Sequence, residues 1–134
     1  MKSNYEKVVE FHRVFGLDYN LIPTVPDEST IKLQMSLIEE ELEELKDEVE
    51  SKGEEFSMSK TAKELTDLLY VVYGLGARYG VPVDKVFAEV HDSNMSKLVD
   101  GKPIRNDDGK VLKGENYFKA DVEKVIREFQ ENYE

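Results

Sequence analysis

The sequence predicts an all-α fold, a bundle of four or five antiparallel helices. Apolar residues recur at steps of three and four, which is the spacing of amphipathic helices rather than strands. Capping residues and glycines bracket each periodic segment, and short loops separate neighbouring segments. With 134 residues, 40% of them hydrophobic, the chain can bury one core, and we expect residues 1–134 to form a single domain.

The first two helices are predicted on either side of a proline-containing loop. Residues 4–15 place Val8, Phe11 and Phe15 on one stripe, and Gly16 follows as a stop signal. After the loop at residues 17–26, either Asp27 or Ser29 can cap a long helix that runs to about residue 51. The apolar positions of the long helix form the cleanest amphipathic stripe in the chain: Ile31, Met35, Ile38, Leu42, Leu45 and Val49.

The third helix is predicted from Ser57 or Ser59 to about Tyr79, and Gly80 ends it. It is apolar over more than half of its circumference. Because few other helices are available to surround it, we expect part of this surface to contact a second copy of the chain. Its broad apolar face comprises Met58, Thr61, Leu65, Leu68, Leu69, Val72 and Leu75.

The last third of the chain predicts two more helices around a loop. Pro82 suits the first turn of a fourth helix, which stops before Gly101. Residues 101–117 are rich in turn signals, including Asp108-Gly109, and are predicted to be loop with a small hairpin. Asp121 is predicted to cap a final helix that runs to about Tyr133.

Composition excludes several classes of function. The chain has no cysteine, which removes disulfides, thiolate metal sites and thiol nucleophiles. No apolar run approaches the ~20 residues that span a bilayer, and the N-terminus lacks the apolar core of a signal peptide, so we expect a cytoplasmic location. A net charge of −11 argues against nucleic acid and anionic membranes as partners.

Carboxylates concentrate on two of the predicted helices. Residues 39–55 hold ten acidic residues against two lysines. Glu41 and Glu44 share a face of the long helix, with Glu40 just beyond, and Glu64 and Asp67 share a face of the next helix. On both helices the acids continue the line of apolar residues. A solvated acidic face is the ordinary interpretation of such a run, and Glu64 would then pair with Lys60 or Lys63.

Electrostatic magnitudes favour a cation site instead. Four ionised carboxylates within about 5 Å of one another repel by roughly 3 kcal/mol per pair at an effective dielectric constant near 20. The total approaches about 20 kcal/mol, which exceeds the stability of a typical domain. A core-facing cluster therefore needs protons or cations. Oxygen ligands favour Mg²⁺ or Mn²⁺, whereas a di-iron site requires Glu-x-x-His pairs, which the sequence lacks.

The acidic motifs resemble the EExxE…ExxD signature of the all-α, MazG-like nucleoside triphosphate pyrophosphohydrolases, which include phosphoribosyl-ATP pyrophosphohydrolases and dimeric dUTPases. Residues 40–44 supply EExxE, and Glu64-Leu65-Thr66-Asp67 follows after nineteen residues. The resemblance spans most of residues 10–121 and is close to the bacterial dUTPase-like branch. It also covers the segments 10–13, 68–74, 86–91, 94–97 and 108–113.

The resemblance implies a role for each acid. Glu41, Glu44, Glu64 and Asp67 would hold Mg²⁺, with Mn²⁺ as a possible substitute, and Glu40 would be an outer residue or the base that activates water. The implied reaction cleaves a nucleoside triphosphate between its α- and β-phosphates, giving a monophosphate and pyrophosphate. Metal-assisted hydrolysis of this kind suits a cluster of carboxylates.

Outside the acidic motifs, the candidate substrate contacts are weaker. By resemblance, Asn94 would bind the substrate and Lys97 its phosphates, although both also suit an ordinary helix surface. His12, beside an aromatic residue, would help to cover the base, yet a structural histidine is the more common case. The basic residues of the following loop would either close over a triphosphate or solvate the loop: Lys102, Arg105, Lys110 and Lys113.

We therefore predict a Mg²⁺-dependent pyrophosphohydrolase acting on a deoxyribonucleotide such as dUTP, in nucleotide-pool house-cleaning. The same chemistry on dCTP, a modified nucleotide or phosphoribosyl-ATP is the alternative within this class. An acidic helical module that binds a basic partner without catalysis is the alternative outside it. The resemblance also implies a homodimer, or a dimer of dimers.

Overall fold

The computed structural model describes residues 1–51 and 53–133 and confirms the all-α fold. Its elements divide into two compact units, Met1–Val81 and Pro82–Glu134, which are described separately below. That both units belong to one domain remains a prediction. Lys52, one of the two lysines of the acidic segment, lies outside the described residues. Among the helices described, none is long and apolar enough to cross a membrane.

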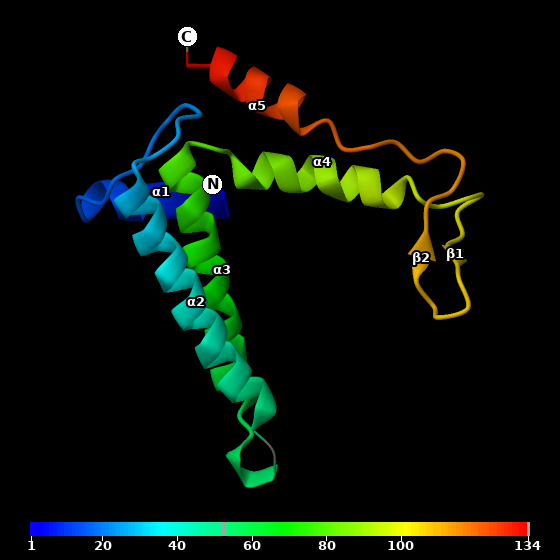
Figure 1. Cartoon of the computed structure of the whole chain (residues 1–134), viewed down its shortest axis with the longest axis horizontal. Helices are drawn as coiled ribbons and strands as arrows, with labels where there is room; N and C mark the ends of the chain where they lie inside the picture. The colour runs from blue at the N-terminus through cyan, green and yellow to red at the C-terminus, as the bar shows by residue number, and fades with distance from the viewer. Residues whose placement is uncertain (52, 134) are drawn as a thin grey trace. The chain divides into compact units, whose positions relative to one another are not determined.

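The first unit contains α1 (Asn4–Val14), α2 (Glu28–Glu50), the short 3-10 turn η1 (Gly53–Glu55) and α3 (Met58–Tyr79). Helices α2 and α3 lie side by side and antiparallel, and α1 packs against α3 near the end where α2 begins (Figure 1). The three predicted helices are thus confirmed, with ends within a residue or two of those expected. The η1 turn was not predicted.

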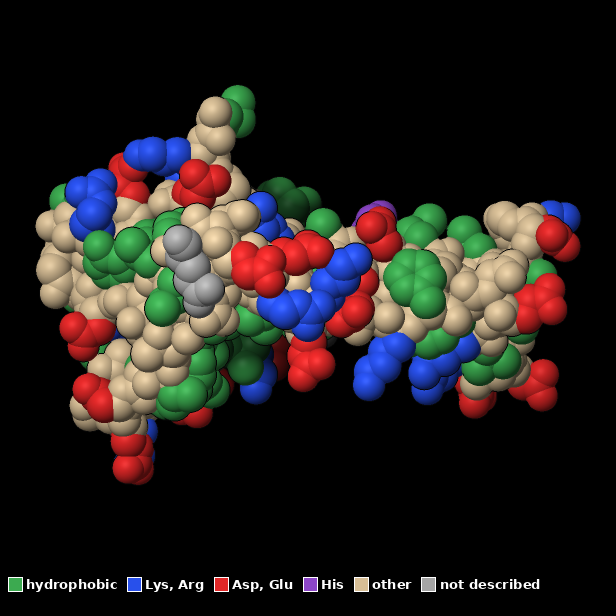
Figure 2. All heavy atoms as spheres, turned by 90° about the horizontal axis from the view of Figure 1, so that it is seen from above, with side chains coloured by type: hydrophobic (Ala, Val, Ile, Leu, Met, Phe, Trp, Pro, Cys, Tyr) green, Lys and Arg blue, Asp and Glu red, His purple; other side chains and the backbone are tan. Residues whose placement is uncertain are grey.

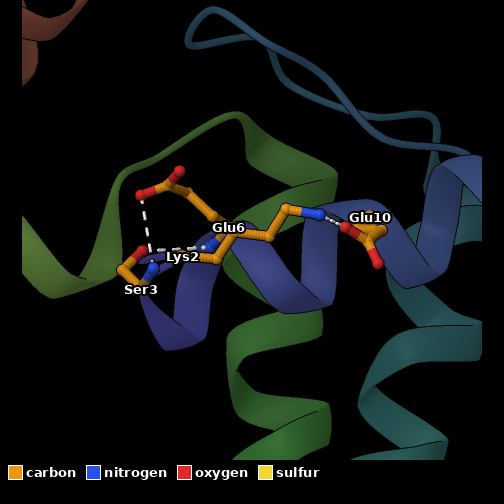
Figure 3. Close-up of polar contacts among 4 residues, drawn as sticks. All are labelled: Lys2, Ser3, Glu6 and Glu10. Atoms are coloured by element: carbon orange, nitrogen blue, oxygen red, sulfur yellow. Dashed lines mark hydrogen bonds and ion pairs between the residues drawn. The ribbon is translucent and has the colours of Figure 1, made fainter.

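Local chemistry explains where the helices of the first unit begin. The Ser3 hydroxyl accepts a hydrogen bond from the Glu6 amide, and the Glu6 carboxylate accepts one from the Ser3 amide, which makes a capping box at the start of α1 (Figure 3). Lys2, which precedes the helix, pairs with Glu10 on it (Figure 3). Asp27 caps α2, and its hydrogen bonds, chiefly from the Thr30 amide, lower the pKa of its carboxyl.

Helix α3 begins and ends at residues that the sequence identifies. Ser57 accepts a hydrogen bond from the Lys60 amide at the N-terminal cap. Gly80 ends the helix with φ 69°, a left-handed conformation that favours glycine. A Cβ at Gly80 would also lie 2.2 Å from the Ile22 carbonyl oxygen, so the loop before α2 can pass this close only over a glycine.

The face that α2 turns toward α3 differs from the predicted stripe. The fully buried α2 residue is Gln34, only 2% exposed, whereas Met35, Leu42 and Val49 are exposed and Ile38 is half-buried. An amphipathic stripe is expected to face the core, and for Met35, Leu42 and Val49 this expectation is wrong. The contact with α3 follows the line through Gln34 and Glu41, which is polar at both positions. Met35, Leu42 and Val49 are therefore on the surface, and apolar side chains are visible on the outside of the chain in Figure 2.

The second unit contains α4 (Val83–Met95), a two-stranded antiparallel ladder and α5 (Val122–Glu131). Pro82 occupies the capping position before α4 rather than its first turn. Strands β1 (Ile104–Arg105) and β2 (Val111–Leu112) form the predicted hairpin, with Gly109 at φ 82° in the turn. Helix α5 packs on α4 and buries Phe129, and the Asp121 side chain caps it as predicted.

Candidate metal centre

Three carboxylates from two helices converge in the first unit. Glu41 of α2 and Glu64 and Asp67 of α3 each offer an oxygen, and these three oxygens all lie within 4.8 Å of one another. The helix periodicity causes this convergence, since Glu64 and Asp67 are one turn apart and Glu41 lies on the α2 face that meets α3. All three side chains are half-buried rather than solvated.

The cluster lacks protein partners at two of its atoms. Glu41 Oε2 and Glu64 Oε2 are buried and have no hydrogen-bond partner. Buried polar atoms are nearly always hydrogen-bonded in folded proteins, so two such oxygens at one place call for a ligand. Anionic oxygens in this arrangement suit a hard divalent cation such as Mg²⁺ or Mn²⁺. The residues present therefore fit the cation that the sequence predicts.

Glu44 lies at the edge of this cluster. It is exposed, and its carboxyl lies close enough to those of Glu41 and Glu64 for each to affect its pKa. The contact with Glu41 raises the pKa of Glu44 more than any other influence. Burial, followed by the contact with Glu44, raises the pKa of Glu64. Raised pKa values of neighbouring carboxyls are what mutual repulsion of negative charges produces.

Two further charged residues border the cluster. Lys63 Nζ lies 2.6 Å from Asp67 Oδ2, one turn along α3, and this contact raises the pKa of Lys63. The sequence offered Lys63 as a partner for Glu64, but its ion pair is with Asp67. Glu40, the predicted base, is exposed on α2, and its charge contributes to the raised pKa of Glu44.

His12 lies deep in the first unit. It is 3% exposed, and its Nδ1 hydrogen-bonds the Asp18 carbonyl at 3.0 Å, so this nitrogen carries the proton. Burial, reinforced by nearby Arg78 and opposed by the Asp18 bond, lowers the pKa of His12. Its role in covering a base remains a prediction.

The other predicted substrate contacts belong to the second unit. Asn94 is exposed near the end of α4, and Lys97 is half-buried just beyond it. The Gly114 amide donates to the Lys97 carbonyl, which brings the chain after Lys113 back to this point. Lys113 Nζ lies 4.9 Å above the Tyr117 ring, and Lys110 is exposed in the hairpin. Their binding roles remain predictions.

The sequence did not predict a polar cluster that the structure contains. Gln34 and Arg78 are buried and bonded to each other, Nε to Oε1 at 3.1 Å, in the same helix pair as the carboxylates. The signal that could have found them is positional. Gln34 precedes Glu41 by two turns on α2, and Arg78 follows Val71 by two turns on α3, so both continue the line of the acidic residues.

Comparisons with known proteins agree with this arrangement. A family model described as phosphoribosyl-ATP pyrophosphohydrolase matches residues 8–94, a range that includes all the acids of the cluster. Uncharacterized protein L479 of Acanthamoeba polyphaga mimivirus is 38% identical over 86 residues, which are 61% of this chain and 33% of that protein. The chain thus spans about a third of this relative's length. The chain belongs to the phosphoribosyl-ATP pyrophosphohydrolase family, within the MazG-like all-α NTP pyrophosphohydrolase superfamily.

Proposed function

We propose that this protein is a metal-dependent pyrophosphohydrolase that cleaves a nucleoside triphosphate between its α- and β-phosphates. The observation that carries the proposal is the convergence of Glu41, Glu64 and Asp67, two of which bury an unpartnered oxygen. The family match supports a pyrophosphohydrolase-type reaction at the level of the superfamily. The products are a nucleoside monophosphate and pyrophosphate.

Each acid has a distinct part in the proposed reaction. Glu41, Glu64 and Asp67 would hold the cation, and Glu44, at the edge of the cluster, would add negative charge to the site. A Mg²⁺ or Mn²⁺ ion held there would offset phosphate charge and make a water molecule easier to deprotonate. Glu40 accepts the proton of the attacking water. The water oxygen forms a P–O bond to one phosphorus of the α–β bridge, and the bond from that phosphorus to the bridging oxygen breaks. The bridging oxygen leaves with the other phosphate product.

The proposed substrate is a deoxyribonucleoside triphosphate, dUTP first. Phosphoribosyl-ATP is the second candidate, because the matching family model carries its name. Both candidates present a triphosphate to the same carboxylates, and the same bond breaks. The basic and amide groups of the second unit are proposed to bind these substrates: Asn94, Lys97, Lys110 and Lys113.

A substrate panel tests the activity. Pyrophosphate release is measured for dUTP, dCTP, the other common nucleoside triphosphates, damaged nucleotides and phosphoribosyl-ATP, each with and without Mg²⁺. We expect one substrate to be preferred, a monophosphate product, and negligible turnover without divalent ions. Release of orthophosphate and a diphosphate would place cleavage at the wrong bond and contradict the proposal. An acidic module without catalysis would release nothing from any substrate.

We further propose that the chain works as a homodimer, or a dimer of dimers. Exposed apolar residues repeat every seven positions on α2 and again on α3. Both lines lie roughly 100° round from the contact between the helices. Because the helices run antiparallel, the two lines fall on the same side and form one apolar surface, which suits a second copy. The lines consist of Met35, Leu42 and Val49 on α2, and Met58, Leu65 and Val72 on α3.

Light scattering at micromolar concentration tests the assembly. We expect a mass of about twice or four times 15.4 kDa. Leu42→Glu together with Leu65→Glu, which puts charge in the middle of the apolar surface, is expected to shift the mass toward the monomer. A stable, active wild-type monomer would contradict the dimer and leave the metal site untouched.

A further inference from the structure

Gln34 makes two hydrogen bonds to α3 from the most buried position of α2. Its Nε2 donates to the Val71 carbonyl at 2.8 Å, and its Oε1 accepts from Arg78 Nε at 3.1 Å. The Gln34 amide therefore bridges two points of α3 that are seven residues apart. Both bonds need one alignment of the helices, because hydrogen bonds weaken steeply with distance and angle.

Gly74 makes room for this bridge. A Cβ at position 74 would lie 2.5 Å from Gln34 Nε2 and 3.3 Å from Gln34 Cδ. The amide cannot retreat from an added methyl group without losing its bond to Val71, because Gln34 is only 2% exposed. Gly74 and Gln34 thus form a matched pair, in which the missing side chain on α3 admits the amide from α2.

The loop between α1 and α2 forms two further hydrogen bonds with Arg78. Arg78 Nη1 donates to the Asp18 carbonyl at 3.0 Å, and Asn20 Nδ2 donates to the Arg78 carbonyl at 2.7 Å. Arg78 is 4% exposed, so a slip of α2 along α3 would take the Gln34 oxygen away from Arg78 Nε and leave this N–H without an acceptor in the interior. An unpartnered buried polar group is costly, whereas apolar contacts are non-directional and tolerate a slip.

The bridge lies on the same helix faces as the carboxylate cluster. Gln34 precedes Glu41 by seven residues on α2, and Val71 follows Asp67 by four residues on α3. At 1.5 Å per residue these separations are about 10 Å and 6 Å. Over so few turns a helix transmits a shift at one position to the other. The alignment at Gln34 is therefore also the alignment of Glu41 with Glu64 and Asp67.

We infer that Gln34 is a positioning residue for the metal centre: its bonds to Val71 and Arg78, admitted by Gly74, fix α2 against α3 and thereby set the spacing of Glu41 from Glu64 and Asp67. This inference rests on the proposed function, since it assigns Gln34 a task only if the carboxylates hold a cation. Residues behind a metal site commonly matter in this way, because displaced ligands bind the ion more weakly.

Calorimetric titration of Mn²⁺ into metal-free protein tests the inference. Gln34→Met keeps the approximate volume of the side chain and removes both hydrogen bonds. We expect the dissociation constant for Mn²⁺ to rise by about tenfold or more, and the electron paramagnetic resonance spectrum of bound Mn²⁺ to change. The matched control is Val8→Ala, which removes buried side-chain atoms from α1 without touching the bridge. This control should lower the melting temperature and leave Mn²⁺ affinity within twofold.

A second pair of variants keeps the test decisive if Gln34→Met folds poorly. Gly74→Ala alone should weaken Mn²⁺ binding like Gln34→Met, because the methyl group displaces the amide. In a Gln34→Ala background the same Gly74→Ala change should have little further effect, since the clashing amide is gone. Additive effects of the two changes would overturn the matched pair, and unchanged Mn²⁺ affinity in the folded variants would overturn the positioning role. Failure of the wild-type protein to bind Mn²⁺ would instead overturn the proposed function.

Discussion

Near Gly74, α2 and α3 bury Gln34 and Arg78, and each of these side chains has a hydrogen-bond partner. Further along the same helices, one oxygen of Glu41 and one of Glu64 are buried without a hydrogen-bond partner. The two regions lie on the same helices: the satisfied region around Gln34 and Arg78, and the carboxylate region around Glu41, Glu64 and Asp67. They differ in whether the protein satisfies its own polar atoms. A satisfied network stabilises one arrangement of the helices, whereas an unsatisfied one carries a cost that a ligand can remove.

The pKa shifts follow the same division. Burial lowers the pKa of His12 and of Arg78 in the satisfied region. A positive charge in addition to the hydrogen-bonded guanidinium is therefore disfavoured there. In the carboxylate region the pKa values of Glu44 and Glu64 are raised, which disfavours a further negative charge. A divalent cation at the carboxylates would offset the repulsion that raises these two pKa values.

The largest expected effect comes from removing a carboxylate of the carboxylate region. Glu41→Gln, Glu64→Gln and Asp67→Asn should each lower pyrophosphate release by at least about 100-fold while the protein stays folded, because the cation loses a charged ligand. Glu44→Gln should also lower it. The matched control is Glu43→Gln, the same change on the exposed side of α2. Full activity in any two of the site variants would remove the assignment.

Breaking the satisfied region should cost stability instead. Arg78→Met leaves the Gln34 oxygen without its donor in the interior, and we expect the free energy of unfolding to fall by about 2–3 kcal/mol in urea titrations. Lys32→Met, which removes an exposed pair with Glu28, should change it by less than about 0.5 kcal/mol. Equal changes in the free energy of unfolding would mean that the buried network contributes no more to stability than an exposed ion pair.

The carboxylate region predicts the opposite sign for the metal-free protein. Because folding raises the pKa of Glu64, the charged form is disfavoured in the folded state, and stability from this group falls as pH rises above the ordinary glutamate pKa. Glu64→Gln should therefore raise the melting temperature of the metal-free protein at pH 7. The difference from wild type should shrink as pH falls toward the ordinary glutamate pKa. A lower melting temperature for the variant at pH 7 would contradict this.

The smallest expected effect concerns Lys63, whose ammonium pairs with Asp67 where a cation would bind. Lys63→Met should tighten Mn²⁺ binding by up to about fivefold, in line with the small free energy of an exposed ion pair. Lys60→Met, one turn earlier on α3, removes the same charge from an exposed lysine and serves as the control. Equal changes in both variants would show that only net charge matters.

Much of the fold could be predicted because its signals are local. Ser57, Asp27 and Asp121 cap helices where their side chains can accept backbone hydrogen bonds, and Gly80 ends α3 with a positive φ. These features depend on a few neighbouring residues. The face that α2 turns toward α3 does not, since it depends on which residues of a distant helix meet it. Helical periodicity cannot distinguish the core of one chain from an exposed apolar face, so it does not reveal that Met35, Leu42 and Val49 are exposed.

The candidate site divides in the same way. Glu41, Glu64 and Asp67 were predictable because two short motifs place them on helix faces, and the structure brings these three together. That Glu44 stands at the edge, and that Lys63 pairs with Asp67, depends on side-chain geometry between helices. Gln34 was not recognised because a single glutamine in an amphipathic helix usually faces solvent. Its importance arises from Gly74 and Arg78, more than thirty residues away.

If the carboxylates of Glu41, Glu64 and Asp67 bind a cation as proposed, calorimetric titration of Mn²⁺ should show it directly. We expect saturable binding to the wild-type protein and to Glu43→Gln, with a melting temperature that rises with Mn²⁺ concentration. We expect Glu64→Gln to lose this binding. Weak, unsaturable heats that are the same in all three proteins would contradict the proposed cation site.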